Sequence, residues 1–195
     1  EDSVDILDRL GMAAFKIGSA DITSLPLIRH IARKGKPIIL STGASTIGDI
    51  EVAIRAIHDE GLYDIVLLHC ILSYPTQYSE ANLQMMVRLQ QIFLDIPVGY
   101  SDHTLADHNM TVPLAAAAMG ARVIEKHFTM DKSMLGNDHY LSMDPADLEQ
   151  WTASLKILYE AQGKDGPRTP LPSRGAGGGH GASQPCLTSR HSRWD

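Results

Sequence analysis

The sequence is poor in cysteine and in long apolar runs, and each shortage excludes a class of protein. Cys70 and Cys186 are the only cysteines among 195 residues, too few for a disulfide framework and consistent with a reducing compartment. No run approaches the roughly 18 apolar residues that a membrane span requires, and Glu1-Asp2-Ser3 does not open a signal peptide. We therefore expect a cytoplasmic protein without a membrane partner.

Basic charge is also scarce in most of the chain. Residues 1–162 hold 12 Lys and Arg against 21 Asp and Glu, whereas residues 163–195 hold 5 against 2. An acidic body argues against nucleic acid as the main partner.

Gly, Pro and Ser make up 15 of the last 33 residues, with few large apolar groups to offset chain entropy. We expect a folded domain over 1–162 and a disordered tail over 163–195.

Five short apolar or β-branched runs are present, and stretches with helical periodicity such as Ile50–Ile57 separate them. The five runs are Ala13–Ile17, Pro37–Leu40, Asp64–His69, Pro97–Tyr100 and Arg122–His127. Strands joined by crossover helices must be parallel, so the sequence predicts an α/β fold. A last helix is expected to begin at Asp144-Pro145 and to end at Gly163.

Polar residues follow the carboxyl ends of all five predicted strands. A closed barrel gathers every strand end around one mouth, whereas an open doubly wound sheet gathers them mainly at its switch point. The distribution favours a (βα)8 TIM barrel. Because such a barrel needs eight βα units and about 250 residues, we expect this chain to hold five of the eight units.

Two histidines at the ends of the fourth and fifth predicted strands form a candidate metal site. Side chains alternate along a strand, so Ser101 and His103 share one face, as do Glu125 and His127. If both faces point into the mouth, the imidazoles lie about 5 Å apart. Such a pair suits Mn²⁺, Co²⁺ or Zn²⁺ better than Mg²⁺. Spacing alone fits equally well a pair of hydrogen-bonded histidines that cap strands.

One lysine and three serines at the ends of three strands form a candidate phosphate site: Lys16, Ser19, Ser41 and Ser101. An ammonium and hydroxyls together hold phosphate oxygens. A serine after a strand is more often a turn residue, so Lys16 is the most informative, because an ammonium ending an apolar strand needs an anion. Asp138 follows the last strand and fits either a sugar hydroxyl or an Asx-type turn.

Six motifs occur in a fixed order along the chain. They are Lys16-Ile17-Gly18-Ser19, Ser41-Thr42-Gly43, Leu68-His69-Cys70 with Tyr74-Pro75, Gly99–Thr104, Glu125–Phe128 and Asp138-His139. Their order and spacing resemble those of the N-acetylneuraminate (sialic acid) synthase family. The resemblance implies the last five units of a TIM barrel that condenses phosphoenolpyruvate with N-acetylmannosamine, or a close relative. The product would be a nine-carbon 2-keto sugar acid, with release of phosphate.

The resemblance also implies a role for each site residue. Phosphoenolpyruvate would be bound by Lys16, Ser19, Ser41 and Ser101, the amino sugar by Tyr74, Glu125 and Asp138, and a divalent metal, most often Mn²⁺, by His103 and His127. Lys16, Glu125 and His127 would be the catalytic residues. Full-length relatives would form homodimers.

The chain also departs from the family pattern. Leu72 stands where many members carry an asparagine that binds phosphate, and the family's N-terminal strands and C-terminal antifreeze-like domain have no counterpart. One alternative is the same chemistry on N-acetylmannosamine 6-phosphate or on precursors of pseudaminic or legionaminic acid. Another is a truncated, non-catalytic fragment, whose open sheet edges would make it unstable or prone to aggregate. A different metal-dependent aldolase is a more distant alternative.

Overall fold

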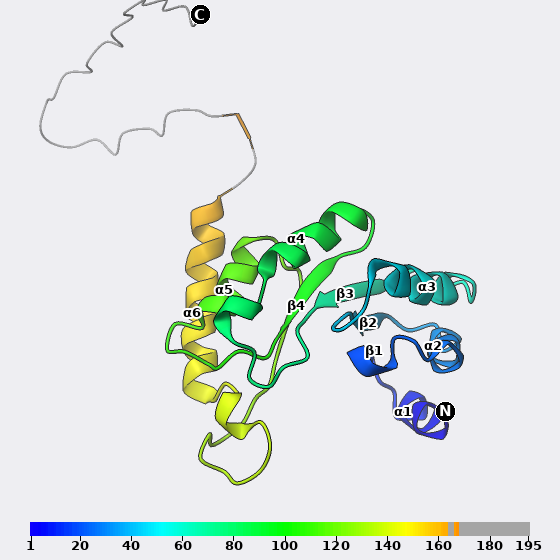
Figure 1. The fold of residues 1–195 in the computed structure, drawn as a ribbon, viewed down its shortest axis with the longest axis horizontal. Coiled ribbons are helices and arrows are strands. Elements are labelled where there is room, and N and C mark those ends of the chain that lie inside the picture. Colours follow the sequence, from blue (N-terminus) through cyan, green and yellow to red (C-terminus); the bar gives the residue numbers. More distant parts are fainter. Residues whose placement is uncertain (164–165, 168–195) are drawn as a thin grey trace, which may run out of the picture. The chain divides into compact units, whose positions relative to one another are not determined.

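Five parallel strands with helices between them make up residues 1–163, one of two units in the chain; the computed structural model describes residues 1–163 and 166–167 (Figure 1). The strands are β1 (Phe15–Ile17), β2 (Ile38–Ser41), β3 (Ile65–His69), β4 (Val98–Asp102) and β5 (Ile124–Lys126). The α-helices are α1 (Asp2–Arg9), α2 (Leu25–Ala32), α3 (Ile47–His58), α4 (Leu83–Ile92), α5 (Thr111–Ala118) and α6 (Pro145–Gln162). Short 3₁₀ turns occupy Ser19–Asp21, Tyr78–Glu80 and His139–Leu141. In these described ranges, no helix has both the length and the apolar character for crossing a membrane.

The sheet is a curved half-barrel. Each strand pairs with the next one along the chain, in the order β1-β2-β3-β4-β5, without the reversal of a doubly wound sheet. Lys16 on β1 and Glu125 on β5 belong to opposite edges, yet Lys16 Nζ lies 3.6 Å from Glu125 Oε1. Four strand spacings in a flat sheet would put these strands about 19 Å apart. The predicted α/β fold with five barrel units is confirmed.

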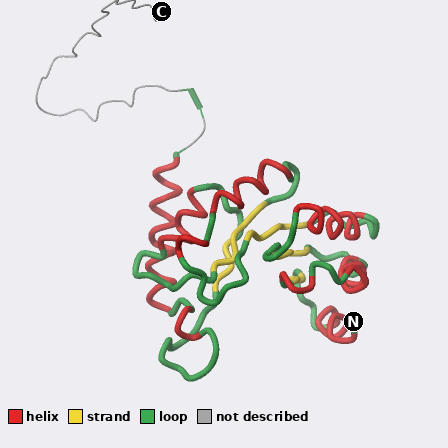
Figure 2. The backbone as a smooth tube through the Cα atoms, in the orientation of Figure 1, coloured by secondary structure: helices red, strands yellow, loops and turns green. Residues whose placement is uncertain are grey.

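The hydrophobic core lies between the outer face of the sheet and the helices. Phe15, Leu40, Leu67 and Tyr100 point to this face and are almost completely buried. The helix α2 packs against α3, α4 packs against β3 and β4, and α5 packs against β4 and α6. Figure 2, in the orientation of Figure 1, shows the strands in the middle, with α1, α2 and α3 to the right, α5 and α6 to the left and α4 above. The concave face is left free for polar groups.

Strand β4 is held unusually close to its neighbours at one position. A Cβ on Gly99 would overlap the backbone carbonyl of Val123 and would lie 2.8 Å from Leu68 Cδ2. Pairing with β5 extends β4 to Asp102, two residues beyond the predicted end at Tyr100. Glycine is therefore required for the pairing that brings the ends of β4 and β5 together.

The two longest helices begin at capping boxes. Thr46 caps α3, and Asp144 caps α6 by accepting a hydrogen bond from the backbone N–H of Asp147 at 3.0 Å. The predicted last helix is thus confirmed, with Gly163 following its final residue. The predicted disordered tail falls almost entirely on residues 164–165 and 168–195, which lie outside the described part of the chain.

Candidate active site

The first group of polar side chains spans the concave face of the half-barrel, and we call it the lysine–serine group: Lys16, Ser41, Ser101 and Glu125. Lys16 Nζ donates to Ser41 Oγ at 2.8 Å, and Ser101 Oγ donates to Glu125 Oε1 at 2.7 Å. The same carboxylate oxygen lies 3.6 Å from Lys16 Nζ. Strands β1, β2, β4 and β5 each contribute one residue to this group.

The hydroxyls of the lysine–serine group are buried, whereas its two charged groups are partly exposed. Ser41 and Ser101 are 3% and 2% exposed, whereas the side chains of Lys16 and Glu125 are 33% and 39% exposed. Glu125 supplies the anion that an ammonium at the end of an apolar strand requires. The group can therefore bind an anionic ligand that displaces the Glu125 carboxylate from the ammonium, with hydroxyls ready to donate to further oxygens.

The structure places Ser19 in a separate group. Ser19 Oγ accepts a hydrogen bond from the backbone N–H of Gly43 at 3.0 Å and lies 3.1 Å from Cys70 Sγ. A Cβ on Gly43 would lie 2.9 Å from both of these side-chain atoms. Within the described ranges, no hydrogen bond joins Ser19 to Lys16. Ser19 thus orders the loop after β2, a role that sequence reasoning missed and that the glycine in Ser41-Thr42-Gly43 could have signalled.

The second group lies just beyond the ends of β4 and β5, and we call it the imidazole group: His103, His127, Tyr74 and Asp138. The ring centroids of His103 and His127 are 5.4 Å apart, with the planes at 76°. The Tyr74 ring lies 4.2 Å from that of His103 and 5.8 Å from that of His127. Asp138 Oδ2 lies 3.7 Å from His127 Nδ1. The structure thus brings the two histidines predicted at the ends of β4 and β5 together with Tyr74 and Asp138, two of the residues that the resemblance assigned to the amino sugar.

The hydrogen bonds of His103 determine which nitrogen it can offer. His103 Nδ1 lies 2.9 Å from the carbonyl oxygen of Ile71, and because a carbonyl only accepts, Nδ1 carries the proton. Nε2 therefore keeps a free lone pair. Burial lowers the pKa of His103 by desolvating the charged form, and the nearby His127 lowers it further. The neutral imidazole that a metal requires is thus the favoured form.

The donor set is compatible with a metal that keeps open coordination positions. Over the residues that the structure describes, no cluster of three or more His, Cys, Asp and Glu side chains is arranged to hold an ion. Two neutral imidazoles alone would leave most positions to water or to ligand oxygens. The backbone carbonyl of Ile71 accepts a hydrogen bond from His103 Nδ1 and so fixes the orientation of the ring, as is usual for histidines that bind metals through the other nitrogen.

Two charged residues between the site residues were missed by sequence reasoning. Asp102 and Lys126 alternate with the site residues along β4 and β5 and are buried on the opposite face, with Lys126 Nζ 2.8 Å from Asp102 Oδ2. Their alternation with Ser101 and His103, and with Glu125 and His127, was the available signal, because neighbouring strand residues face opposite sides.

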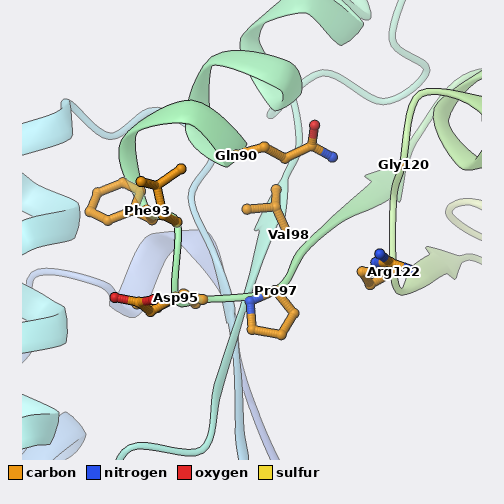
Figure 3. A pocket seen from close by; sticks show the side chains of 9 residues that line it. Gln90, Phe93, Asp95, Pro97, Val98, Gly120 and Arg122 are labelled. Atoms are coloured by element: carbon orange, nitrogen blue, oxygen red, sulfur yellow. The ribbon is translucent and has the colours of Figure 1, made fainter. Parts of the chain in front are cut away.

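Two cavities differ in their relation to the site. A cavity of about 630 Å³ near Asp95, Pro97 and Arg122 lies at the amino ends of β4 and β5 (Figure 3). It is therefore at the end of the barrel opposite to the candidate site, where catalytic residues of TIM-barrel enzymes are not found. Another cavity, of about 560 Å³, lies between α3 and α4 and reaches Cys70 and Leu72 beside the site.

Comparisons with known proteins agree with the geometry. The family model described as "NeuB family" matches residues 1–166. An uncharacterized protein of Methanocaldococcus jannaschii is 48% identical over 87% of this chain and 49% of its own length. An N,N'-diacetyllegionaminic acid synthase of Campylobacter jejuni is 44% identical over 83% of this chain and 48% of its own.

A solved structure is similar over the same range. The crystal structure of N-acetylneuraminic acid synthetase from Leptospira borgpetersenii, in complex with citrate, superposes with a TM-score of 0.79 at 32% identity. The match covers 88% of this chain and 58% of that one. The chain thus spans about half the length of the curated relatives it matches.

Proposed function

The chain belongs to the NeuB family, and we propose that it carries part of the active site of a synthase that condenses phosphoenolpyruvate with an N-acetylated amino sugar. One observation carries the proposal. The lysine–serine group and the imidazole group share the strands β4 and β5, so an ammonium with buried hydroxyls lies beside a pair of imidazole rings. This arrangement suits a reaction between a phosphorylated molecule and a carbonyl compound.

The lysine–serine group would bind the phosphate of phosphoenolpyruvate. Lys16 supplies a charge-assisted hydrogen bond to the phosphate, and the hydroxyls of Ser41 and Ser101 donate to its other oxygens. Phosphate and the Glu125 carboxylate would compete for the same ammonium, so anion binding frees Glu125 to accept hydrogen bonds from the sugar. Lys16 faces negative charge both in the substrate and in the released phosphate, which makes it useful throughout the reaction.

The imidazole group would receive the amino sugar. His103 and His127 would hold a divalent metal, which we propose is Mn²⁺, and the ion would supply Lewis acidity that makes the aldehyde carbon of an open-chain sugar more electrophilic. Tyr74 and Asp138 flank these rings and would orient the sugar hydroxyls. The methylene carbon of phosphoenolpyruvate would attack the aldehyde carbon. Water would then add to the resulting cationic carbon, and phosphate would leave.

The relatives support more than one acceptor sugar. Their names include a synthase of N-acetylneuraminic acid and a synthase of diacetylated legionaminic acid. We propose N-acetylmannosamine as the acceptor, with N-acetylmannosamine 6-phosphate and the precursors of legionaminic and pseudaminic acid as alternatives.

Phosphate release from phosphoenolpyruvate tests the proposal. We expect release that depends on both an N-acetylated hexose and Mn²⁺, measured with a panel of such sugars and with chelator as the control. The assay uses this chain and a chain that continues upstream to the length of the relatives. Absence of release from the longer chain with every sugar would refute the synthase proposal. Release from the longer chain alone would assign this chain the incomplete site that the resemblance suggested.

A further inference from the structure

A charged pair is buried on the face of β4 and β5 that points away from the site. The side chains of Asp102 and Lys126 are 0% and 1% exposed. Asp102 Oδ1 accepts hydrogen bonds from the backbone N–H and the hydroxyl of Thr104, at 3.1 and 2.8 Å, and from the Tyr100 hydroxyl at 3.2 Å. Lys126 Nζ donates to the backbone carbonyl of Thr104. The pair therefore joins the ends of both strands through side chains.

Stability alone is a poor explanation for this pair. Desolvation of two buried charges offsets most of their attraction, and apolar replacements of such pairs are often neutral or stabilising. Asp102 Oδ2 lies 2.8 Å from Lys126 Nζ, so the attraction within the pair offsets a desolvation cost that an apolar pair would not incur. The pair is better explained by what it holds in place.

The pair lies at the last rung of the β4–β5 ladder. Asp102 and Lys126 are partners in the parallel register, and the two histidines follow directly, outside the bounds of both strands. Backbone pairing therefore stops one residue before His103 and His127. Because side chains alternate between faces, clamping the outer pair fixes the direction in which the next residues leave the sheet.

We propose that Asp102 and Lys126 are positioning residues, which fix the separation and the angle of the His103 and His127 rings by clamping the strand ends from the outer face. The inference rests on the proposed function for the identification of the imidazoles as metal ligands. Its geometric content, the placement of one ring relative to the other, does not depend on a metal. Outer-shell partners that orient ligands typically change metal affinity by about 10- to 100-fold.

Two near-isosteric substitutions in the 195-residue chain test the proposal. Asp102→Asn removes the negative charge and keeps an oxygen for Thr104 and Tyr100, and Lys126→Met removes the ammonium and keeps the length of the side chain. Mn²⁺ affinity is measured by the loss of the free-ion paramagnetic resonance signal. Histidine side-chain ¹⁵N spectra, assigned with His103→Ala and His127→Ala, report the rings without any metal. We expect Mn²⁺ affinity to fall by about 10-fold or more and both ring signals to shift.

The double variant is decisive. Each single variant leaves one buried charge unpaired, which destabilises the fold, so a loss of Mn²⁺ affinity in a single variant can also result from unfolding. Asp102→Asn with Lys126→Met removes both charges. The matched control is Ile57→Ala, a fully buried α3 residue on the outer side of the sheet, which lowers thermal stability without touching β4 or β5. We expect the double variant to keep a cooperative thermal transition and to lose Mn²⁺ affinity, while the control loses stability and keeps affinity within about twofold.

The outcomes separate this inference from the proposed function. Wild-type Mn²⁺ affinity and unchanged histidine spectra in the double variant would overturn the positioning role, and so would loss of its thermal transition, which would make the pair a stability element. If the unmodified chain does not bind Mn²⁺, the metal part of the proposed function fails. The metal-free histidine spectra then decide the positioning role alone, with shifted signals supporting it and unchanged signals refuting it.

Discussion

The lysine–serine group and the imidazole group depend on different parts of the fold. The lysine–serine group closes only because the sheet curves enough to bring Lys16 on β1 within 3.6 Å of Glu125 on β5. The imidazole group needs only the ends of β4 and β5 and the loops after β3 and β5. The proposed anion site thus depends on the whole half-barrel, whereas the histidine pair depends on two strands alone.

Gly99→Ala should break both groups at once and gives the largest effect. A Cβ at this position would overlap the carbonyl of Val123, which is backbone of the neighbouring chain segment and cannot move aside without disturbing β5. We expect the free energy of unfolding to fall by about 3 kcal/mol or more. Denaturant titration measures the loss, and Mn²⁺ and phosphate binding should both disappear under conditions where the unmodified chain binds.

Gly48→Ala is the matched control for the glycine substitution. Gly48 lies in α3, and the nearest atom to an added Cβ is Thr46 Oγ1 at 3.7 Å, an ordinary contact. Alanine there should raise stability by up to about 1 kcal/mol, because glycine is a poor helix former. Equal stability losses in the two variants would contradict the close approach of β4 and β5.

Substitution of either histidine should disable the imidazole group and leave the lysine–serine group intact. His103→Ala or His127→Ala removes one of the two nitrogen ligands, so we expect Mn²⁺ affinity to fall by more than about 100-fold, beyond the usual effect of an outer-shell partner. Phosphoenolpyruvate binding, measured by calorimetry without metal, should stay unchanged. Unchanged Mn²⁺ affinity in both variants would indicate that the histidines cap the strands and do not bind the metal.

The outer face of the sheet was largely predictable from the sequence. Apolar runs such as Asp64–His69 located the strands, and the polar residues after them located the mouth of the barrel. The contact of Lys16 with Glu125 was not predictable, because it depends on how far the sheet curves, and no local pattern encodes that. The burial of Asp102 and Lys126 was partly predictable, since alternation alone places them on the helix-covered face.

The roles of single serines were the least predictable part of the site. Ser19 and Ser41 both follow a strand in the sequence, yet Ser41 accepts a hydrogen bond from Lys16 while Ser19 is held by Gly43 and Cys70. A hydroxyl can donate and accept in many directions, so its partner depends on tertiary packing and not on residue type. Family resemblance assigned both serines to one phosphate, and the structure brings only Ser41 to the lysine.

Lys16→Met should disable the lysine–serine group and spare the imidazole group. Loss of a charge-assisted hydrogen bond costs about 1.5–3 kcal/mol, so phosphoenolpyruvate affinity should fall by about 10- to 100-fold. Mn²⁺ affinity should not change. Lys36→Met is the matched control, because Lys36 pairs with Asp8 at 2.6 Å outside the site. Similar losses of affinity in the two variants would indicate a general effect of charge and would contradict a specific role for Lys16.

Leu72→Asn should have the smallest effect and should strengthen phosphate binding by the lysine–serine group alone. Leu72 is 46% exposed and lies beside Gly43, at the position where the resembled family often has an asparagine for phosphate. One added hydrogen bond of about 1 kcal/mol would tighten phosphoenolpyruvate binding by about fivefold and leave Mn²⁺ affinity unchanged. Leu72→Ala removes the leucine without adding an amide, so calorimetry of the two variants isolates the contribution of the amide. If asparagine binds no more tightly than alanine, the loop after β3 does not reach the phosphate, and the anion site of this chain consists of the lysine–serine group alone.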